Sequence, residues 1–456
     1  MSPMGCGTSK GEPARRRLLL VANPFPPLAS GGNARLLRFA RYLPESGWDV
    51  TVLTVRASGP VPVPTGVRIE RAPSPSPEAM YRLAQQAART VHGARERARV
   101  APGTLSTASR APARRRSSRR GAINDWIFVP DEWVGWIGPA VLHGRRLLRR
   151  ERYDAVMSSF PRPSAELVAS ILARVSGLPF LADYRDPWAT RHLRHYPTPL
   201  HRLAHYALEE WALRPARAVT ATAEPIAETL RRRFPRLAED VTVLPNGYDP
   251  PPSYACSRPP TLGDGFWLVH TGRLYGRSRQ LERMLRAFAT LPDDVHWLFV
   301  GIDGGEVRRV AAALGVGHRV RTIPFVPHDE ALALQQAADG LVLITGDAPE
   351  ALSSKVFEYL AARRPIFAYI PHKSAAHALL AATGGAVVAP QHEPPAQALA
   401  TFIDRARRGA LPPPDRTVVE QYDGRRLTRR LADVLDDLVQ RHRCRATSAR
   451  PPEGGL

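Results

Sequence analysis

The second half of the sequence carries a set of residues suited to binding a diphosphate. Gly272 and Arg273 end the run FWLVHTGR, which predicts a buried strand followed by a helix. A strand that ends in this way presents a guanidinium and backbone N–H groups at the edge of its sheet. Ser353 and Ser354 begin a later predicted helix whose first turn contains Lys355. Hydroxyls and N–H groups at a helix N-terminus can hold phosphate, and the ammonium of Lys355 can neutralise it.

Glu358 follows Lys355 by three residues and lies on nearly the same face of this predicted helix. Its carboxylate can accept hydrogen bonds from two ribose hydroxyls, so the two segments together predict a nucleoside diphosphate site. The pattern SSKxxE alone is also compatible with a capped surface helix that carries a Lys–Glu pair. Its combination with Gly272 and Arg273 favours the ligand site.

Other residues of the second half are candidates for further donor contacts. Arg277 is the candidate for a second phosphate cation, and Arg279 ranks below it. Phe325 and Val326, at the end of a predicted strand, are candidates for the pocket of the nucleotide base, with a place in the strand core as the alternative. His270 fits a core histidine better than a ligand.

The first half contributes a glycine loop and an aspartate. Gly31 and Gly32 follow the first predicted strand, where they let the backbone approach a ligand closely. A plain turn is the alternative. Asp186 follows a predicted strand end, where its carboxylate can contact a substrate or accept a proton, unless it only pairs with Arg185 to cap the loop. Asp183 points to the opposite side if the strand continues, so it ranks lower.

Two series of alternating strands and helices must position these residues. The pattern predicts an α/β fold of two Rossmann-like domains facing a central cleft at the carboxyl ends of both sheets. We expect the following organisation: a disordered lead over 1–14, an N-terminal Rossmann-like domain over 15–248, a second Rossmann-like domain with the nucleoside diphosphate site over 249–420, a C-terminal helix over 421–443 that can pack back on the N-terminal domain, and a disordered tail over 444–456.

The composition is strongly basic. The chain has 456 residues and a net charge of +22, with 64 basic and 42 acidic residues. Only three of the basic residues are lysines, a bias typical of a GC-rich genome. Three scattered cysteines and the absence of a long apolar run predict no disulfide framework, no zinc site and no transmembrane helix. We therefore expect a cytoplasmic protein.

The excess charge is concentrated in the first half, and residues 82–120 hold eleven arginines against one acidic residue, Glu96. This insertion is either a solvated charged segment or an arm for an anionic membrane or a polyphosphate-bearing lipid. No aromatic residues alternate with the arginines, which argues against nucleic acid as a partner. Trp126, Trp133 and Trp136 form either an acceptor or membrane lip or a satellite core.

The order of these motifs resembles a known family. HTGRLYGRS, LERMLRAF and LSSKVFEYLAARRPI are similar to the donor half of retaining glycosyltransferases of the GT-B fold, in the large family 4 group. SGGNAR resembles the family's glycine loop. PDEWVGW, SSFPRPS and LADYRDPW resemble the acceptor half of a subgroup that builds bacterial surface polysaccharides, and PNGYD resembles the interdomain segment. The resemblance spans residues 17–440, except the Arg-rich insertion.

The resemblance implies transfer of a sugar from a nucleotide sugar to an acceptor hydroxyl, with retention at the anomeric carbon and with neither metal nor cofactor. Without a metal, fixed cations and backbone donors must stabilise the departing nucleoside diphosphate, a role that suits Arg273, Lys355 and the helix start at Ser353 and Ser354. The sequence departs from the family's pattern after Arg273, where Gly276-Arg277-Ser278-Arg279 stands in place of the usual Lys-Gly pair. Seven residues separate Glu350 from Glu358, the spacing of the family's Glu-x7-Glu motif.

The resemblance also implies roles in the first half. Asp186 is expected to contact the transferred sugar or to accept the acceptor's proton, and Gly31 and Gly32 are expected to let the backbone approach the donor phosphate or the acceptor.

The expected partners are a nucleotide sugar, an acceptor sugar or lipid-linked glycan, and an anionic membrane surface that would place the protein peripherally on the inner membrane face. Two other classes remain as alternatives. One is a nucleotide-sugar epimerase or phosphorylase on the same two-domain fold. The other is a non-catalytic basic adaptor that binds membranes.

Overall fold

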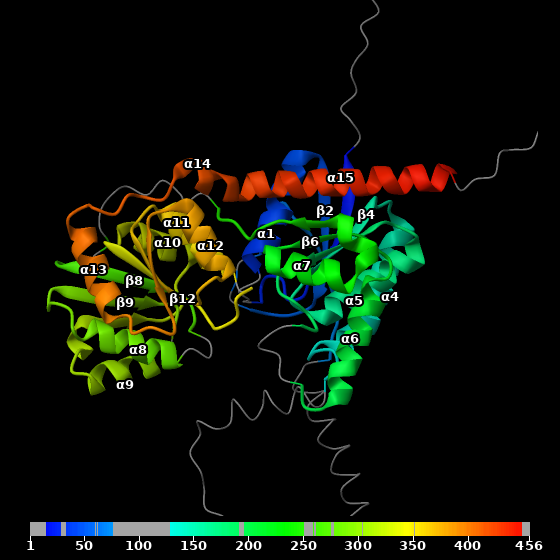
Figure 1. The fold of residues 1–456 in the computed structure, drawn as a ribbon. Helices are drawn as coiled ribbons and strands as arrows, with labels where there is room; N and C mark the ends of the chain where they lie inside the picture. Colours follow the sequence, from blue (N-terminus) through cyan, green and yellow to red (C-terminus); the bar gives the residue numbers. More distant parts are fainter. Residues whose placement is uncertain are drawn as a thin grey trace, which may run out of the picture. The chain divides into compact units, whose positions relative to one another are not determined.

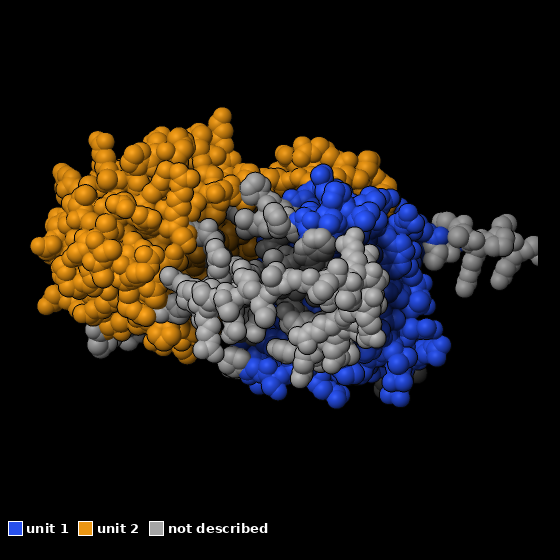
Figure 2. Space-filling model, turned by 90° about the horizontal axis from the view of Figure 1, so that it is seen from below, with its two compact units in different colours: residues 1–220, 432–456 blue, residues 221–431 orange. Residues whose placement is uncertain are grey.

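The computed structural model divides into two compact units. They comprise Met1–Thr220 with Ala432–Leu456, and Ala221–Leu431, and they are coloured separately in Figure 2. The residues that the structure describes are 15–28, 33–59, 61, 63–75, 128–190, 196–249, 259, 261–274, 278–302, 304–350 and 352–448. The Arg-rich insertion predicted over 82–120 lies outside these residues. The domain boundaries expected from the sequence remain predictions.

The first sheet has seven strands in the order β3-β2-β1-β4-β5-β6-β7, and its described pairings are parallel. Its strands are β1 (Arg16–Val21), β2 (Trp48–Val55), β3 (Arg68–Ala72), β4 (Ala155–Phe160), β5 (Phe180–Tyr184), β6 (Ala216–Ala221) and β7 (Val241–Val243). The helices of this part of the chain are α1 (Asn33–Tyr42), α4 (Ile137–Arg150), α5 (Pro163–Ser176), α6 (Pro199–Leu213) and α7 (Glu224–Arg233) (Figure 1). The direction of strand order reverses between β1 and β4.

The second sheet has six strands in the order β10-β9-β8-β11-β12-β13, again with parallel pairings. Its strands are β8 (Phe266–Thr271), β9 (Val295–Val300), β10 (Val320–Ile323), β11 (Gly340–Ile344), β12 (Ile366–Ile370) and β13 (Ala386–Pro390). Its helices are α8 (Ser278–Phe288), α9 (Gly305–Ala313), α10 (His328–Ala337), α11 (Ser354–Ala362), α12 (Ala375–Thr383) and α13 (Ala396–Arg407), followed by the short α14 (Arg416–Val419). The strand order reverses between β8 and β11.

Alternate residues of the second sheet build two cores. Phe266 and Leu268 of β8 belong to a cluster with α8, α9 and α13. Trp267 and Val269 belong to another cluster with α10, α11 and α12. Because successive side chains of a strand point to opposite faces, helices cover both faces of the sheet. Figure 1 shows α8 and α9 on one side of it and α10 to α12 on the other. The predicted α/β class is confirmed.

The last helix, α15 (Gly424–Ser448), is longer than the sequence pattern predicts and continues into the expected tail. From Ala432 onward it belongs to the first unit. Asp436 accepts hydrogen bonds from Arg16 and from the indole of Trp48, the latter at 2.8 Å. Arg443 donates to Asp154 at 2.7 Å. These contacts fasten the helix to β1, β2 and the start of β4. Within the described part of the chain, no helix is both long and apolar enough to cross a membrane.

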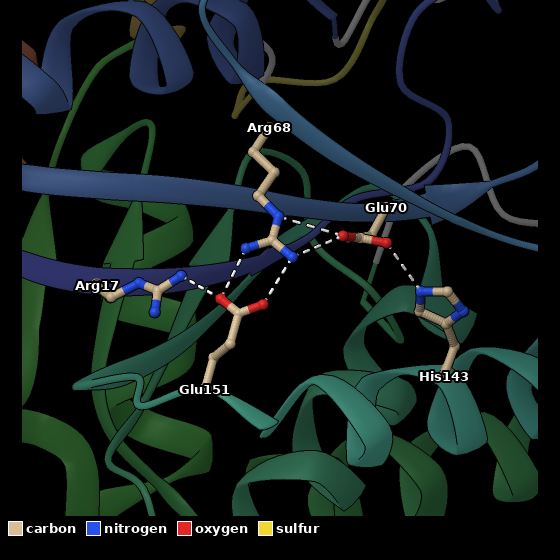
Figure 3. A network of polar contacts seen from close by, with 5 residues as sticks. All are labelled: Arg17, Arg68, Glu70, His143 and Glu151. Atoms are coloured by element: carbon tan, nitrogen blue, oxygen red, sulfur yellow. Dashed lines mark hydrogen bonds and ion pairs between the residues drawn. The ribbon is translucent and has the colours of Figure 1, made fainter. Parts of the chain in front are cut away.

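An ion-pair network ties β1 and β3 to the end of α4 (Figure 3). Arg68 donates to both carboxylate oxygens of Glu151 at 2.6 and 2.7 Å and to Glu70 at 2.9 Å. Arg17 also donates to Glu151, and His143 contacts Glu70 at 3.1 Å. The hydrogen bonds from Arg68 and Arg17 lower the pKa of Glu151 to about 2. Glu151 is therefore ionised at neutral pH, and its contacts with Arg68 and Arg17 are ion pairs.

Candidate functional site

The centre of the candidate site lies where the strand order of the second sheet reverses. Because β8 and β11 are neighbours, the residues after β8 lie beside the helix that follows β11. Lys355, in the first turn of α11, donates to the backbone carbonyl of Arg273 at 3.5 Å. In open α/β sheets, ligands bind outside the carboxyl ends of the strands at such a reversal point. The structure thus brings the side chain of Lys355 to the backbone of Arg273, 82 residues away in the sequence.

Gly272 makes this approach possible. Its φ of +84° is a left-handed conformation that favours glycine. A Cβ atom at this position would lie 2.3 Å from Cε and 2.5 Å from Nζ of Lys355, so the lysine side chain passes directly over the glycine. The Gly272 N–H is fixed by the carbonyl of Val300 on the neighbouring strand, at 2.7 Å. The role of Gly272 is therefore to leave space for Lys355 beside the backbone.

The N-terminus of α11 adds backbone donors to these cations. Ser353 is the N-cap residue, and its hydroxyl accepts a long hydrogen bond of 3.4 Å from the Lys355 N–H. Ser354 is the first residue of the helix. The first N–H groups of a helix lack partners within it and carry a partial positive charge, which makes them anion ligands. The side chains of Ser353, Ser354 and Lys355 are half-buried, at the edge of solvent.

Glu358 lies one turn further along α11, and its carboxylate is held by a residue that the sequence patterns did not reveal. Gln335 of α10 donates to Glu358 at 3.3 Å and to the Thr271 hydroxyl at 3.0 Å. The Tyr359 hydroxyl accepts from the Thr271 N–H at 2.9 Å. Burial raises the pKa of Tyr359 to about 12, so its hydroxyl remains protonated. The end of β8 is thereby fixed to both α10 and α11.

The predicted base-pocket residues follow β10. The strand ends at Ile323, and Phe325 beyond it is 74% exposed, so the alternative that Phe325 belongs to the strand core is wrong. Val326 is half-buried and packs against the cluster under α10 to α12. The Gly301 N–H donates to the carbonyls of Ile323 and Pro324 at 3.1 and 3.2 Å. Phe325 therefore presents an aromatic face to solvent at the same edge of the sheet as Gly272.

The burial of several other residues decides between the alternatives that the sequence left open. His270 is fully buried and its Nδ1 lies 2.9 Å from the Val342 carbonyl, which confirms a core histidine. Trp136 is fully buried and Trp133 is half-buried, which for Trp136 excludes a lip. Arg279 is exposed on α8. Gly31, Gly32, Arg277 and Trp126 lie outside the described residues.

In the first unit, Asp186 and Arg185 form the ion pair that the sequence suggests, with oxygen and nitrogen 3.0 Å apart. The two side chains remain partly accessible, at 31% and 20%. They follow β5 directly, at the carboxyl edge of the first sheet. A partly accessible carboxylate at this edge can still contact a substrate, because its guanidinium partner occupies only part of its accepting capacity.

Asp183, three residues earlier, is a buried carboxylate whose hydrogen-bond partners all belong to the fold. Arg35 donates two hydrogen bonds to its carboxylate, at 3.0 and 2.7 Å. The hydroxyls of Ser159 and Thr220 each donate at 2.7 Å. Burial alone raises the pKa of Asp183, but the charge and hydrogen bonds of these neighbours outweigh it, so the pKa is lowered. This carboxylate is saturated within the fold, in keeping with its low rank as a candidate.

Comparisons with known proteins identify the family. The model described as Glycosyltransferase Family 4 matches residues 98–251. The model described as Glycosyl transferases group 1 matches residues 265–405, so the two matches together span well over half of the chain. The chain belongs to the group 1 glycosyltransferases of family 4.

A curated relative of this glycosyltransferase is the 2-deoxystreptamine glucosyltransferase of Streptomyces kanamyceticus. The two are 27% identical over 257 residues. The alignment covers 51% of the chain and 64% of the relative, so it spans less than two thirds of that enzyme's length.

Solved structures resemble this glycosyltransferase over nearly its whole length. Sucrose-phosphate synthase of Thermosynechococcus elongatus has a TM-score of 0.62 at 17% identity, with 95% of this chain and 100% of that chain covered. Anabaena HepE (Alr3699) in complex with UDP-glucose has a TM-score of 0.54 at 15% identity, with 95% and 99% covered. WaaG, a glycosyltransferase of lipopolysaccharide biosynthesis, has a TM-score of 0.56 at 17% identity, with 92% and 99% covered. These likenesses confirm the GT-B fold.

The candidate residues of this glycosyltransferase are divided between the two matches. Asp186 lies in the Family 4 match, whereas the cluster of Gly272, Arg273, Lys355 and Glu358 lies in the group 1 match. Their roles as catalytic or donor-binding residues remain predictions. Over the described residues, no three His, Cys, Asp or Glu side chains gather closely enough to hold a metal ion.

Proposed function

We propose that this glycosyltransferase moves a sugar from a nucleotide sugar to an acceptor hydroxyl, with retention at the anomeric carbon and without a metal ion. The observation that carries the proposal is the passage of Lys355 over Gly272, against the carbonyl of Arg273 and in the first turn of α11. Two cations and a helix N-terminus at one reversal point suit an anion with two phosphates.

These groups act on the leaving group. As the bond between the anomeric carbon and the diphosphate oxygen breaks, negative charge grows on the diphosphate. Lys355, Arg273 and the N–H groups at Ser353 and Ser354 lie where they can stabilise this charge, and fixed donors need no reorganisation during the reaction. Arg277 is the candidate for a further phosphate contact.

The nucleoside part occupies the same edge of the second sheet. Glu358 accepts hydrogen bonds from the two ribose hydroxyls, and Phe325 with Val326 flanks the base. The names of the relatives favour a uridine nucleotide and glucose, since one is a glucosyltransferase and another was solved with UDP-glucose. UDP-glucose is therefore the first donor to test.

The acceptor side belongs to the first sheet. Asp186 accepts the proton of the acceptor hydroxyl while that oxygen bonds to the anomeric carbon from the face that the diphosphate leaves. The products are the new glycoside, the nucleoside diphosphate and the proton. Gly31 and Gly32, which lie outside the described residues, are the candidates in the sequence for a close backbone approach to the donor phosphate or the acceptor.

The strong positive charge of residues 1–250 favours an anionic acceptor, such as a glycan on a polyprenyl diphosphate used for bacterial surface polysaccharide. The protein then binds peripherally to the inner membrane face, with residues 82–120 as an arm. The name of the curated relative favours a small aminocyclitol as a second candidate acceptor.

The donor is tested by a thermal-shift screen with UDP, GDP, ADP and dTDP and their glucose conjugates. We expect one nucleotide series to raise the melting temperature, equally with and without EDTA. Turnover of the matching sugar nucleotide should give a product whose anomeric configuration, determined by NMR, equals that of the donor. An inverted product, or a turnover that EDTA abolishes, contradicts the proposal. Isomerisation of the sugar nucleotide without an acceptor identifies an epimerase instead.

The acceptor is tested by flotation with anionic and neutral liposomes, and by sugar incorporation into an undecaprenyl diphosphate glycan or into 2-deoxystreptamine. We expect binding to anionic liposomes, incorporation into the lipid-linked glycan, and weaker flotation after deletion of residues 100–120. Unchanged flotation rejects the arm. Incorporation only into 2-deoxystreptamine replaces the polysaccharide assignment with an aminocyclitol one.

A further inference from the structure

A buried amide between β8 and α11 joins the two halves of the proposed nucleotide site. Gln335 is only 1% exposed, on the face of α10 that packs toward the sheet. Its Nε2 donates one proton to the Thr271 hydroxyl at 3.0 Å and the other to the Glu358 carboxylate at 3.3 Å. Both protons of the amide group are thus used, one at the end of β8 and one on α11.

The packing of α10 does not explain a polar residue here. The Oε1 atom of Gln335 is buried without a hydrogen-bond partner among the described residues. A buried polar atom without a partner is unfavourable, and an apolar side chain of similar size would avoid it. The orientation of the amide is fixed by its neighbours, because the reversed orientation would place Oε1 against the carboxylate oxygen of Glu358. The amide is therefore better explained by its hydrogen bond to Glu358 than by the packing of α10.

The contact restricts the Glu358 side chain. A glutamate at the edge of solvent has several rotamers, and a hydrogen bond to one carboxylate oxygen selects among them. The carboxylate retains further lone pairs for a ligand. The other partner of the amide, Thr271, is also fixed in place, because its N–H donates to the Tyr359 hydroxyl. Thr271 immediately precedes Gly272 in the chain. One amide thus holds Glu358 at a set distance from the segment beneath Lys355.

We propose that Gln335 is a positioning residue, which holds the Glu358 carboxylate in register with the diphosphate contacts at Gly272, Arg273 and Lys355. A nucleotide can then engage its ribose and its diphosphate at once. The inference rests on the proposed function, in which Glu358 binds the ribose. Gln335 itself touches neither the donor nor the acceptor.

The test separates the ribose contribution from the rest of nucleotide binding. Dissociation constants are measured by calorimetry for UDP and for 2′,3′-dideoxy-UDP, or for the same pair of whichever nucleoside diphosphate raises the melting temperature most. The ratio of the two constants reports the ribose hydroxyls. The variants are Gln335→Met, which keeps the length without the amide, Gln335→Glu, which places a like charge against Glu358, and Glu358→Gln. Gln336→Met, on the neighbouring half-buried residue of α10, is the matched control.

In the wild type and in the Gln336→Met control we expect the dideoxy analogue to bind at least about ten-fold more weakly than UDP. A ten-fold change corresponds to the loss of about one hydrogen bond to a charged group. Glu358→Gln should nearly abolish this ratio. Gln335→Met should reduce it several-fold while the constant for the dideoxy analogue changes little, and Gln335→Glu should reduce it further. If Gln335→Met does not fold, Gln335→Asn replaces it. This variant keeps the amide on a shorter side chain that no longer reaches Glu358, so the ratio of the two dissociation constants should fall in the same way.

Two results overturn the inference in distinguishable ways. If Glu358→Gln loses the ratio but every folded Gln335 variant keeps it, Glu358 binds ribose without help and the role of Gln335 is rejected alone. If Glu358→Gln keeps the ratio, the ribose role of Glu358 fails, and the inference fails with it. A purely structural role for Gln335 would lower the melting temperature and weaken both nucleotides equally, which also rejects the proposal.

Discussion

The carboxyl edges of the two sheets use charge in opposite ways. In the first unit, Arg35 and Asp183 are 2% and 0% exposed and satisfy each other. In the second unit, Arg273 is exposed, and Lys355 and Glu358 are half-buried. The comparison shows that the same position in a Rossmann-like sheet can hold a structural ion pair or leave charges accessible to a ligand. Burial, more than residue type, distinguishes the two uses.

The largest expected effect comes from removing one partner of the buried ion pair, which should lower the stability of the first unit. Asp183→Ala leaves the Arg35 guanidinium buried without its carboxylate, and the loss of one partner of a buried pair destabilises by about 3–5 kcal/mol. Chemical denaturation should show this loss. Asp186→Ala, which removes a partly exposed carboxylate three residues away, is the control, and it should change activity much more than stability. A stable Asp183→Ala protein would contradict the structural role.

The next effect separates the backbone conformation of Gly272 from its contact with Lys355. Gly272→Ala places a methyl group where Lys355 now lies and forces alanine to a positive φ, which destabilises by about 1–3 kcal/mol. Gly315→Ala is the matched control, since Gly315 has φ +73° with no atom within 4 Å of its Cβ position. Calorimetry should show loss of nucleoside diphosphate binding only for Gly272→Ala. Equal binding by both variants would remove Gly272 from the site.

The first unit also contains a buried carboxylate, Glu166, which has no cationic partner of the kind that Asp183 has among the groups that shift its pKa. Burial raises the pKa of Glu166 to about 8, while the Ser158 hydroxyl, 2.5 Å away, partly opposes this. Unfolded, the group titrates near its ordinary value of 4.5. The folded form therefore keeps a proton that the unfolded chain loses, so stability falls as pH rises from about 4.5 to 8.

Thermal unfolding between pH 5.5 and 8.5 measures this dependence. We expect the melting temperature of the wild type to fall by several degrees, and Glu166→Gln, which has no proton to lose, to flatten the profile. Glu210→Gln, at an exposed position on α6, is the control and should leave the slope unchanged. Equal slopes in the wild type and in Glu166→Gln would show that Glu166 is ionised in the folded protein.

The smallest effect concerns the ion-pair network of Figure 3. Glu151→Gln weakens the contacts of Arg68 and Arg17, and because these side chains are partly exposed the loss should be at most about 1 kcal/mol. With the pKa of Glu151 lowered to about 2, its contribution is present above about pH 4.5 and is lost as pH falls toward 2. Denaturation at pH 7 and pH 3 should show a smaller difference in the variant than in the wild type.

The alternation of strands and helices predicts the two sheets, but the apolar periodicity does not reveal helix α4. The buried residues of α4 are Ala140, Gly144 and Leu147. A glycine at the centre of this face hides the apolar pattern, yet it is required, because a Cβ at Gly144 would lie 2.5 Å from the Leu172 side chain. Close helix packing of this kind depends on a partner distant in sequence, which periodicity does not show.

The residues proposed to bind the diphosphate could be selected from the sequence because glycine, arginine, lysine and helix-capping serine carry their chemistry in their type and spacing. The supporting residues were not. Gln335 stands in an ordinary helical pattern, and its contacts with Thr271 and Glu358 arise only from the pairing of β8 with β11. The pairing of Arg35 with Asp183 likewise depends on how α1 lies against β5.

The most direct test of the account is the binding of a nucleoside diphosphate and of its parent nucleoside to the wild type and to Lys355→Ala, by calorimetry at one ionic strength. We predict that the substitution weakens the diphosphate by about 30-fold or more, the equivalent of about 2 kcal/mol for a charge-assisted contact, and leaves the nucleoside unchanged. Equal weakening of both ligands, or no weakening of the diphosphate, would contradict the claim that the reversal point of the second sheet binds the leaving group.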